Sequence, residues 1–143
     1  MPSLPHGDAQ DLVERLKRAL EKRDVDAAMA CFADDAELRP DPFAPAVSDM
    51  TAIRAWFNAL AASVVHVEVD AERIWLAGDT VLVAFHGAWT QRASAERTRI
   101  RGMLTLELDA EGRVRRARAW ALSRVVGIDS TIAPTGEPAE SQS

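Results

Sequence analysis

The chain has 143 residues, of which 48% are hydrophobic and 27% charged, and its formal net charge is −5. This length suits one domain with a core of its own, and the composition is that of a globular protein. The acidic balance argues against a nucleic-acid partner, because phosphate binding depends on a basic surface. No apolar run is long enough for a signal peptide or a membrane span, and the single Cys31 cannot form an intrachain disulfide. We therefore expect a cytoplasmic protein.

The composition divides the chain into three parts. Residues 1–7 form a lead-in that contains Pro, Ser and Gly, residues 8–127 carry regular apolar patterns, and residues 128–143 are rich in Pro, Ser, Thr and Glu. Segments of the first and last kind rarely bury enough apolar surface to fold. We expect a flexible lead-in, one domain and a disordered tail.

Three helices are predicted in the first half of the domain. Apolar residues recur at helical spacing across 8–22, and a short helix is predicted over 25–32 with Asp24 as its N-cap. A third helix should begin after Ser48 or Asp49.

The rest of the domain shows the alternation of strands. Strands are predicted over 36–39, 65–70, 73–76, 80–90, 99–108 and 114–125, with turns at 77–79 and 109–112. Helices followed by a run of antiparallel strands indicate an α+β fold. The strand over 80–90 is apolar on both faces, so both faces should be covered, the outer one most simply by a second copy of the chain. Trp75 and Trp120 fit that outer face, which predicts a homodimer.

Two stretches resemble a known superfamily. Residues 10–38 read QDLVERLKRALEKRDVDAAMACFADDAEL, and residues 103–121 read MLTLELDAEGRVRRARAWA. They resemble the opening and the closing hairpin of SnoaL-like proteins and steroid delta-isomerases, which belong to the nuclear-transport-factor-2-like superfamily. The resemblance implies a cone-shaped barrel, in which a curved, mostly antiparallel sheet packs on three N-terminal helices around one apolar pocket.

The resemblance does not extend to the isomerase mechanism. Steroid isomerases combine an Asp base with an oxyanion hole made by a Tyr and a protonated Asp. In the resemblance, Leu16 stands at the position of the Tyr, and the position of the protonated Asp lies near Leu104. The chain contains no Tyr at all. Loss of one such donor typically costs about 10²–10³ in rate, so a standard ketosteroid isomerase is not expected.

Two residues are predicted to act as acid or base. Asp41 lies one residue after the position of the isomerase base, at Pro40, and an apolar pocket would raise its pKa into a useful range. The alternative is an exposed turn residue before Pro42. His86 is the second candidate; alternation places it on the face opposite Phe85, and only a register shift would bring it to the pocket.

A wall of apolar residues is predicted to contact the substrate, with plain core packing as the alternative. Its members are Phe43, Trp56, Phe57, Val83, Phe85, Trp89 and Leu104. The three histidines have no metal-ligand spacing, and no phosphate loop or dinucleotide fingerprint is present, so neither a metal nor a cofactor is expected.

These features predict an apolar-pocket protein that acts on a hydrophobic metabolite by proton transfer, as an isomerase, cyclase or dehydratase would. The alternative is a non-catalytic ligand-binding or dimerisation module of the same fold. The expected partners are a small hydrophobic molecule and a second copy bound through the outer sheet face, without nucleic acid or membrane.

Overall fold

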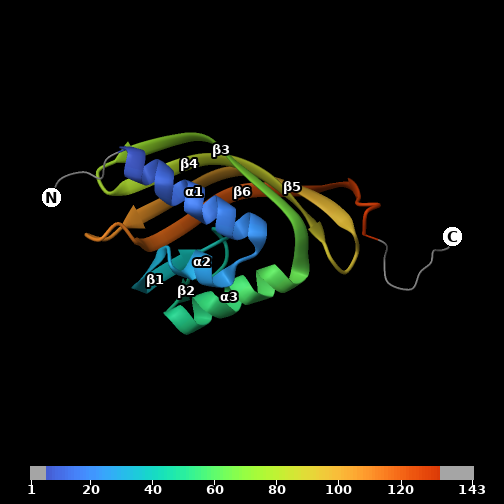
Figure 1. The fold of residues 1–143 in the computed structure, drawn as a ribbon, viewed down its shortest axis with the longest axis horizontal. Helices are drawn as coiled ribbons and strands as arrows, with labels where there is room; N and C mark the ends of the chain where they lie inside the picture. The colour runs from blue at the N-terminus through green and yellow to red at the C-terminus, as the bar shows by residue number, and fades with distance from the viewer. Residues whose placement is uncertain (1–5, 133–143) are drawn as a thin grey trace.

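The fold is α+β, as the order of the predicted elements indicated. The computed structural model describes residues 6–132. The helices are α1 (His6–Lys22), α2 (Val25–Met29) and α3 (Met50–Ser63), and the strands are β1 (Phe32–Arg39), β2 (Val47–Ser48), β3 (Val64–Ala77), β4 (Thr80–Gln91), β5 (Glu96–Leu108) and β6 (Val114–Ile128). Figure 1 shows the helices on one side of the curved sheet, with α1 lying across the long strands.

One six-stranded sheet forms in the order β2-β1-β6-β5-β4-β3. Neighbouring strands run antiparallel, except that β1 and β6 run parallel. The ends of the sheet, β2 and β3, do not pair with each other, so the expected barrel is an open, curved sheet. The mostly antiparallel arrangement on N-terminal helices is confirmed.

The second helix is shorter than predicted. Asp24 caps it, because its Oδ1 accepts a hydrogen bond from Ala27 N at 3.1 Å. The helix ends at Met29 rather than at residue 32, and Phe32 already pairs with Val114 of β6. Pairing with the sheet therefore decides this boundary, which local propensity does not mark.

The third helix begins at one of its two predicted caps. Asp49 Oδ1 accepts a hydrogen bond from Ala52 N at 2.9 Å, and Asp49 has a φ of 67°. The two-residue strand β2 precedes it and pairs with Glu37 and Leu38 of β1. Two residues are too few to show alternation, so β2 was not predicted.

Strand β3 runs through the interruption predicted near residue 71. Its pairing with β4 shifts between Val65 and Glu68 and again between Ala71 and Arg73. Each shift inserts one extra residue into β3 and bends the strand, as β-bulges do. The bends let β3 curve around the end of α1, against which it packs.

The last strand continues beyond its predicted end at residue 125. Ile128 pairs with Glu96 of β5, and Asp129 N donates to Ala95 O at 2.7 Å. Part of the segment predicted as a tail is thus held against the sheet. The rest of that prediction, and most of the predicted lead-in, lie outside the described residues.

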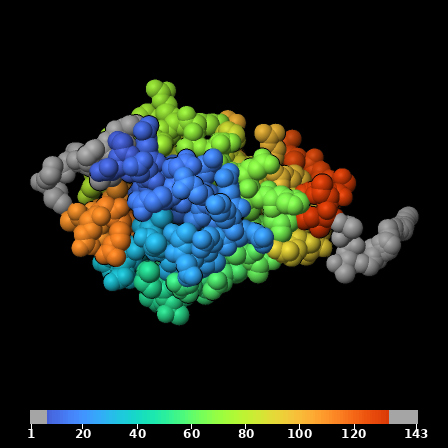
Figure 2. Space-filling model, in the orientation of Figure 1, coloured from blue at the N-terminus to red at the C-terminus, as the bar shows by residue number. Residues whose placement is uncertain are grey.

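The core lies between the helices and the sheet face that they cover. Its most deeply buried side chains include Leu12, Ile53, Val81, Leu106 and Val114. In Figure 2 the helices cover most of the face shown, while the far end of β6 stands clear of them. None of the helices within residues 6–132 has the length and hydropathy needed to cross a bilayer. The cytoplasmic location stays a prediction.

Candidate functional site

A cavity of about 340 Å³ lies between the helices and the inner face of the sheet. All three helices and the strands β1, β3, β4, β5 and β6 contribute to its wall. Most of the lining is aliphatic or aromatic, including Val13, Leu16, Leu20, Leu60, Val67, Val69, Ile100, Ala117 and Ala119. Because this lining is mostly apolar, the cavity suits a hydrophobic guest.

Six of the predicted contact residues line this cavity. They are Trp56, Phe57, Val83, Phe85, Trp89 and Leu104. Phe57 packs edge-on against Phe32 and Trp56, with ring centroids 5.7 and 5.1 Å away. The aromatic residues of α3 are therefore braced against β1 on one side of the cavity.

Alternation along β4 explains why its three cavity-lining residues lie on the same face of the sheet. Side chains two positions apart in a strand point the same way, so Val83, Phe85 and Trp89 face the helices together. Val83 pairs directly with Leu104 of β5, and Phe85 pairs with Gly102.

Phe43 does not line the cavity. It lies between β1 and β2, with 96% of its surface exposed. Asp41 is also exposed, and its Oδ1 accepts a hydrogen bond from Phe43 N at 2.9 Å. Its neighbour Pro40 does line the cavity. The geometry at Asp41 is that of a turn residue just outside the cavity, because the loop turns away after Pro40.

His86 lies on the opposite face of the sheet from Phe85. Its Nε2 is 3.7 Å from Glu72 Oε2, and the same carboxylate is 3.1 Å from Arg101 Nη2. His86 also borders a groove of about 410 Å³ with Arg99 and Leu122 on that outer face. The pairing of β4 with β5 has no register shift at His86, so its side chain stays on the face away from the cavity.

Four charged residues reach the cavity and have partners within the protein. Lys17 Nζ lies 3.8 Å from Asp70 Oδ1, and Arg23 Nη1 donates to Val64 O at 3.4 Å. Asp24 caps α2, and Glu68 Oε2 lies 3.1 Å from Arg97 Nη2. The two positive and two negative residues cancel, so the cavity offers no excess charge to a guest.

Trp89 carries an unmatched hydrogen-bond donor. Its Nε1 is buried and has no acceptor, and within residues 6–132 only Arg118 Nε shares this state. A buried donor without a partner costs about 1–3 kcal/mol. The sequence indicates only that this Trp is apolar and faces inward; the missing acceptor depends on the neighbours that the fold supplies.

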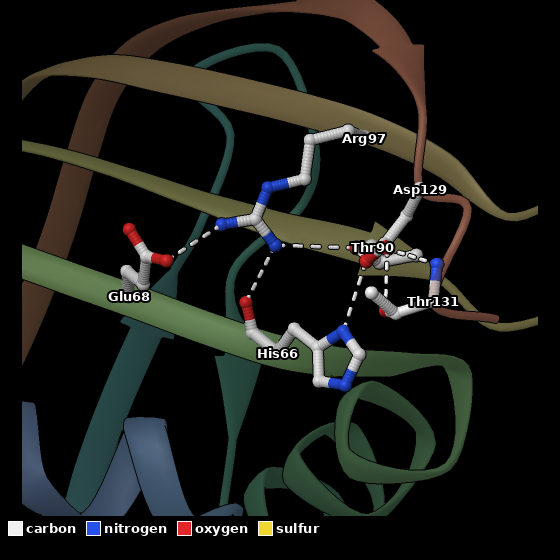
Figure 3. A network of polar contacts seen from close by, with 6 residues as sticks. All are labelled: His66, Glu68, Thr90, Arg97, Asp129 and Thr131. Atoms are coloured by element: carbon white, nitrogen blue, oxygen red, sulfur yellow. Dashed lines mark hydrogen bonds and ion pairs between the residues drawn. The ribbon is translucent and has the colours of Figure 1, made fainter.

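A polar network lies beside the cavity, where the ends of four strands meet (Figure 3). Asp129 Oδ2 accepts hydrogen bonds from Thr90 Oγ1 at 2.6 Å and from His66 Nδ1 at 2.9 Å. Its Oδ1 accepts from Thr131 N at 3.0 Å. Hydrogen bonds from Thr131, Thr90 and His66, in that order, hold the pKa of Asp129 well below its ordinary value.

Arg97 links this network to the cavity wall. Its Nη1 donates to His66 O at 2.7 Å and to Thr90 Oγ1 at 3.2 Å, while its Nη2 pairs with Glu68. The network thus fixes the starts of β3 and β5 and the end of β4 relative to one another. Sequence reasoning missed it, because its members are far apart in the chain and form no motif.

The described part of the chain offers no cluster of three or more His, Cys, Asp or Glu side chains that could hold a metal ion. Sequence reasoning found Trp56 and Phe57 of α3, but it missed the residues of α1, α2 and β6 in the cavity wall. The 3.6-residue spacing of α1 indicates an apolar face, but not whether that face fills a core or borders a cavity.

Residues 13–117 match the model of the SnoaL-like domain, so the chain belongs to that family. No curated protein sequence matches it significantly. Among solved structures, it is similar to the epoxide hydrolase/cyclase-like enzyme SalBIII, which has a role in pyran ring formation in the polyether salinomycin. That match has a TM-score of 0.74 and 19% identity, and covers 85% of this chain and 96% of the other.

Two proteins from Mycobacterium tuberculosis are also similar. One is RV0760c in complex with estradiol-17beta-hemisuccinate, with a TM-score of 0.70, 16% identity, and coverage of 79% of this chain and 92% of the other. The second is an LEH-like epoxide hydrolase, with a TM-score of 0.69, 22% identity, and coverage of 81% and 84%. At these identities the likeness establishes the shared fold.

Proposed function

We propose that this protein binds a neutral, hydrophobic small molecule in the cavity between its helices and its sheet. The observation that supports this most directly is the wall of the cavity, where apolar side chains surround about 340 Å³ of space. This volume lies within the range of about 300–1,000 Å³ found for ligand sites. RV0760c, which has a similar fold, binds estradiol-17beta-hemisuccinate; the apolar steroid part of that ligand supports a hydrophobic guest, while its hemisuccinate group carries a carboxylate.

A matched pair of variants tests this proposal. Ala119 lines the cavity on β6, whereas Ala84 alternates with Val83 and Phe85 on β4 and so faces the opposite side of the sheet. Nile red, a neutral dye that fluoresces in apolar surroundings, should bind the wild-type protein. Ala119→Phe should abolish this binding by filling the cavity, and Ala84→Phe should leave it in place.

Titration of dye fluorescence provides the measurement, with circular dichroism as the check on folding. If Ala84→Phe abolished binding and Ala119→Phe did not, the dye would occupy the outer sheet face. That outcome would refute a ligand site in the cavity.

A second candidate function is proton transfer on the bound molecule, as an isomerase, cyclase or dehydratase would perform it. Two observations favour it: Pro40 lines the cavity directly beside Asp41, and the fold is shared with an epoxide hydrolase/cyclase-like enzyme. Asp41 would act as the base after its loop turns inward. His86 is the less suitable candidate, because it lies on the outer face.

Hydrogen–deuterium exchange at carbon tests this second candidate without a known substrate. If the protein removes protons next to a carbonyl group, it should accelerate exchange of the methyl protons of 2-acetylnaphthalene in D₂O, followed by NMR. Asp41→Asn should then lower the exchange rate by about 10²–10⁴. Exchange at the rate of buffer alone would count against proton transfer, and leave the binding proposal standing.

We also propose a homodimer through the outer face of the sheet. Trp75 and Trp120 on that face are each 41% exposed, and Leu122 is 85% exposed. The helices cover only the other face (Figure 1). An interface of this kind usually buries about 2,000 Å² or more. A second copy would remove these side chains from water.

Sedimentation at micromolar concentration distinguishes the dimer from the monomer. Trp120→Glu should dissociate a dimer, because a carboxylate would be buried in an apolar interface. Phe43→Glu is the matched control, since Phe43 is almost fully exposed in the loop between β1 and β2. A wild-type protein that sediments as a monomer would rule out this interface.

A further inference from the structure

The face of the sheet that the helices leave uncovered carries different side chains at its two ends (Figure 1). Strand pairing places Trp75 and Trp120 level with residues 82–84 of β4. Arg99 and Arg124 lie nearer to the other end of the same strand. The two Trp residues of the proposed dimer are thus at one end, and the arginines at the other end need a separate explanation.

The groove of about 410 Å³ on the outer face lies at the arginine end. Strands β4, β5 and β6 supply its lining, which is basic along one part and aliphatic along another. The lining residues are His86, Arg99, Ile100, Arg101, Leu122, Ser123, Arg124 and Val126. Leu122 and Val126 are 85% and 48% exposed, so apolar surface meets water beside the basic side chains.

Two of the three arginines in the groove have no carboxylate partner within residues 6–132. Arg101 Nη2 lies 3.1 Å from Glu72 Oε2, and the same oxygen lies 3.7 Å from His86 Nε2. Arg99 and Arg124 take part in no ion pair of the described chain. The charge of Arg101 is therefore balanced, whereas two positive charges in the groove are not.

Arg99 and Arg124 are also direct cross-strand neighbours. They face each other in the pairing of β5 with β6, and Ala88 is the β4 neighbour of Arg99. Like charges directly opposite each other in a sheet are destabilising. An anion held between the two guanidinium groups would remove this repulsion, and guanidinium forks match the geometry of phosphate oxygens.

We infer that this groove binds a small phosphate monoester whose apolar group lies against Leu122 and Val126. A phosphate monoester carries about −1.5 to −2 charge at pH 7, so it balances both Arg99 and Arg124, whereas a carboxylate balances only one. Its oxygens accept hydrogen bonds from the two guanidinium groups. The groove and the cavity lie on opposite faces of the sheet, so this site does not depend on the proposed cavity ligand.

Two probes, 1-naphthyl phosphate and inorganic phosphate, test the site, and phosphorus NMR titration gives their affinities. Arg99→Gln and Arg124→Gln should each weaken both probes about three- to tenfold, because each removes a charge-assisted hydrogen bond. Arg115→Gln is the matched control, because Arg115 is exposed on the same strand as Arg124 but is absent from the groove. It should leave both affinities unchanged.

Leu122→Ala tests the apolar part of the groove. It should weaken 1-naphthyl phosphate about threefold and leave inorganic phosphate unchanged, because only the first probe has an apolar group to bury. Ala119→Phe, which fills the cavity, should leave both probes unaffected. A loss of naphthyl phosphate in Ala119→Phe, with none in Arg124→Gln, would place that probe in the cavity and overturn the inference.

Two further outcomes would also overturn it. Equal losses in Arg115→Gln and Arg124→Gln would mean that the probes follow the general surface charge rather than a site. A wild-type protein that binds neither probe would leave the groove without a phosphate ligand. If that protein also sedimented as a dimer that Arg124→Gln tightens, the occupant of the groove would be a second copy of the chain.

Discussion

The two faces of strand β4 carry similar side chains but have different surroundings. Val83 and Phe85 face the helices, and Val83 is 2% exposed. Leu82 and Ala84, at alternate positions, face away from the helices, where no other element of the described chain covers them. Both faces look equally apolar in the sequence. The comparison shows that an apolar strand face can belong to a core, a cavity wall or an interface, and that the neighbouring elements decide which.

The largest expected effect comes from making the same change on each face. Leu106 is completely buried on the helix side of β5, whereas Leu122 of β6 is 85% exposed. Leu106→Ala should lower the free energy of unfolding by about 3 kcal/mol, because it leaves a cavity in the core. Leu122→Ala should change it by less than about 0.5 kcal/mol. Urea denaturation measures both, and equal losses would contradict the difference between the faces.

The second-largest loss of stability is expected at the close contact between β5 and β6, which holds the sheet together beneath both of its faces. A Cβ at Gly102 would lie 2.2 Å from Trp120 O and 2.5 Å from Ala121 Cα, both backbone atoms. Gly102→Ala should therefore destabilise the protein by about 2 kcal/mol. Gly127 of β6 has nothing within 4 Å of such a Cβ, so Gly127→Ala is the control. A tolerated Gly102→Ala would mean that the strands can separate at little cost.

A smaller loss is expected from Asp129, which holds the end of β6 against β3 and β4. The folded-state pKa of Asp129 is lowered by its hydrogen bonds, so its carboxylate stabilises the fold at neutral pH. This contribution should decline as the pH falls below about 4, the ordinary value of an Asp. Asp129→Asn should therefore be less stable than wild type at pH 7, and the difference should shrink in acid.

Thermal unfolding from pH 7 downward checks this prediction. Thr90→Val removes one of the donors to Asp129 and should weaken the pH dependence without abolishing it. A difference between wild type and Asp129→Asn that stayed constant down to pH 3 would show that the charge of Asp129 does not matter.

The smallest effect is expected for the ion pair on the outer face. Arg101 Nη2 lies 3.1 Å from Glu72 Oε2, and the Arg101 side chain is 67% exposed. Exposed pairs contribute about 0–1 kcal/mol, and salt screens them. Arg101→Ala should change stability by less than about 0.5 kcal/mol, measured by urea denaturation. A larger loss that persisted in 1 M salt would indicate packing rather than charge.

Much of the fold could be predicted from local patterns. The spacing of Leu12 and Leu16 predicted α1, and Asp24 marked the start of α2. The strand predicted over 80–90 agrees with β4 to within one residue. Errors occurred where pairing overrode local preference, as at Phe32, which joins β6 instead of extending α2. The two-residue β2 was too short to leave a pattern.

The candidate site was predictable only in part. Alternation along β4 placed Phe85 and Trp89 on one face, and both line the cavity. It could not place Phe43, which follows Pro42 in an irregular loop where no periodicity applies. Nor could it indicate that Asp41 bonds to the backbone of Phe43, because that contact depends on the turn.

The sequence by itself determined the class of fold and the apolar faces of the helices and strands. These follow from residue identity and short-range periodicity, which the chain carries locally. Only the tertiary structure decided which apolar face surrounds a cavity, that the charged side chains at its wall have partners within the protein, and that Trp89 Nε1 lacks an acceptor. Such properties depend on residues far apart in the chain, and packing alone brings them together.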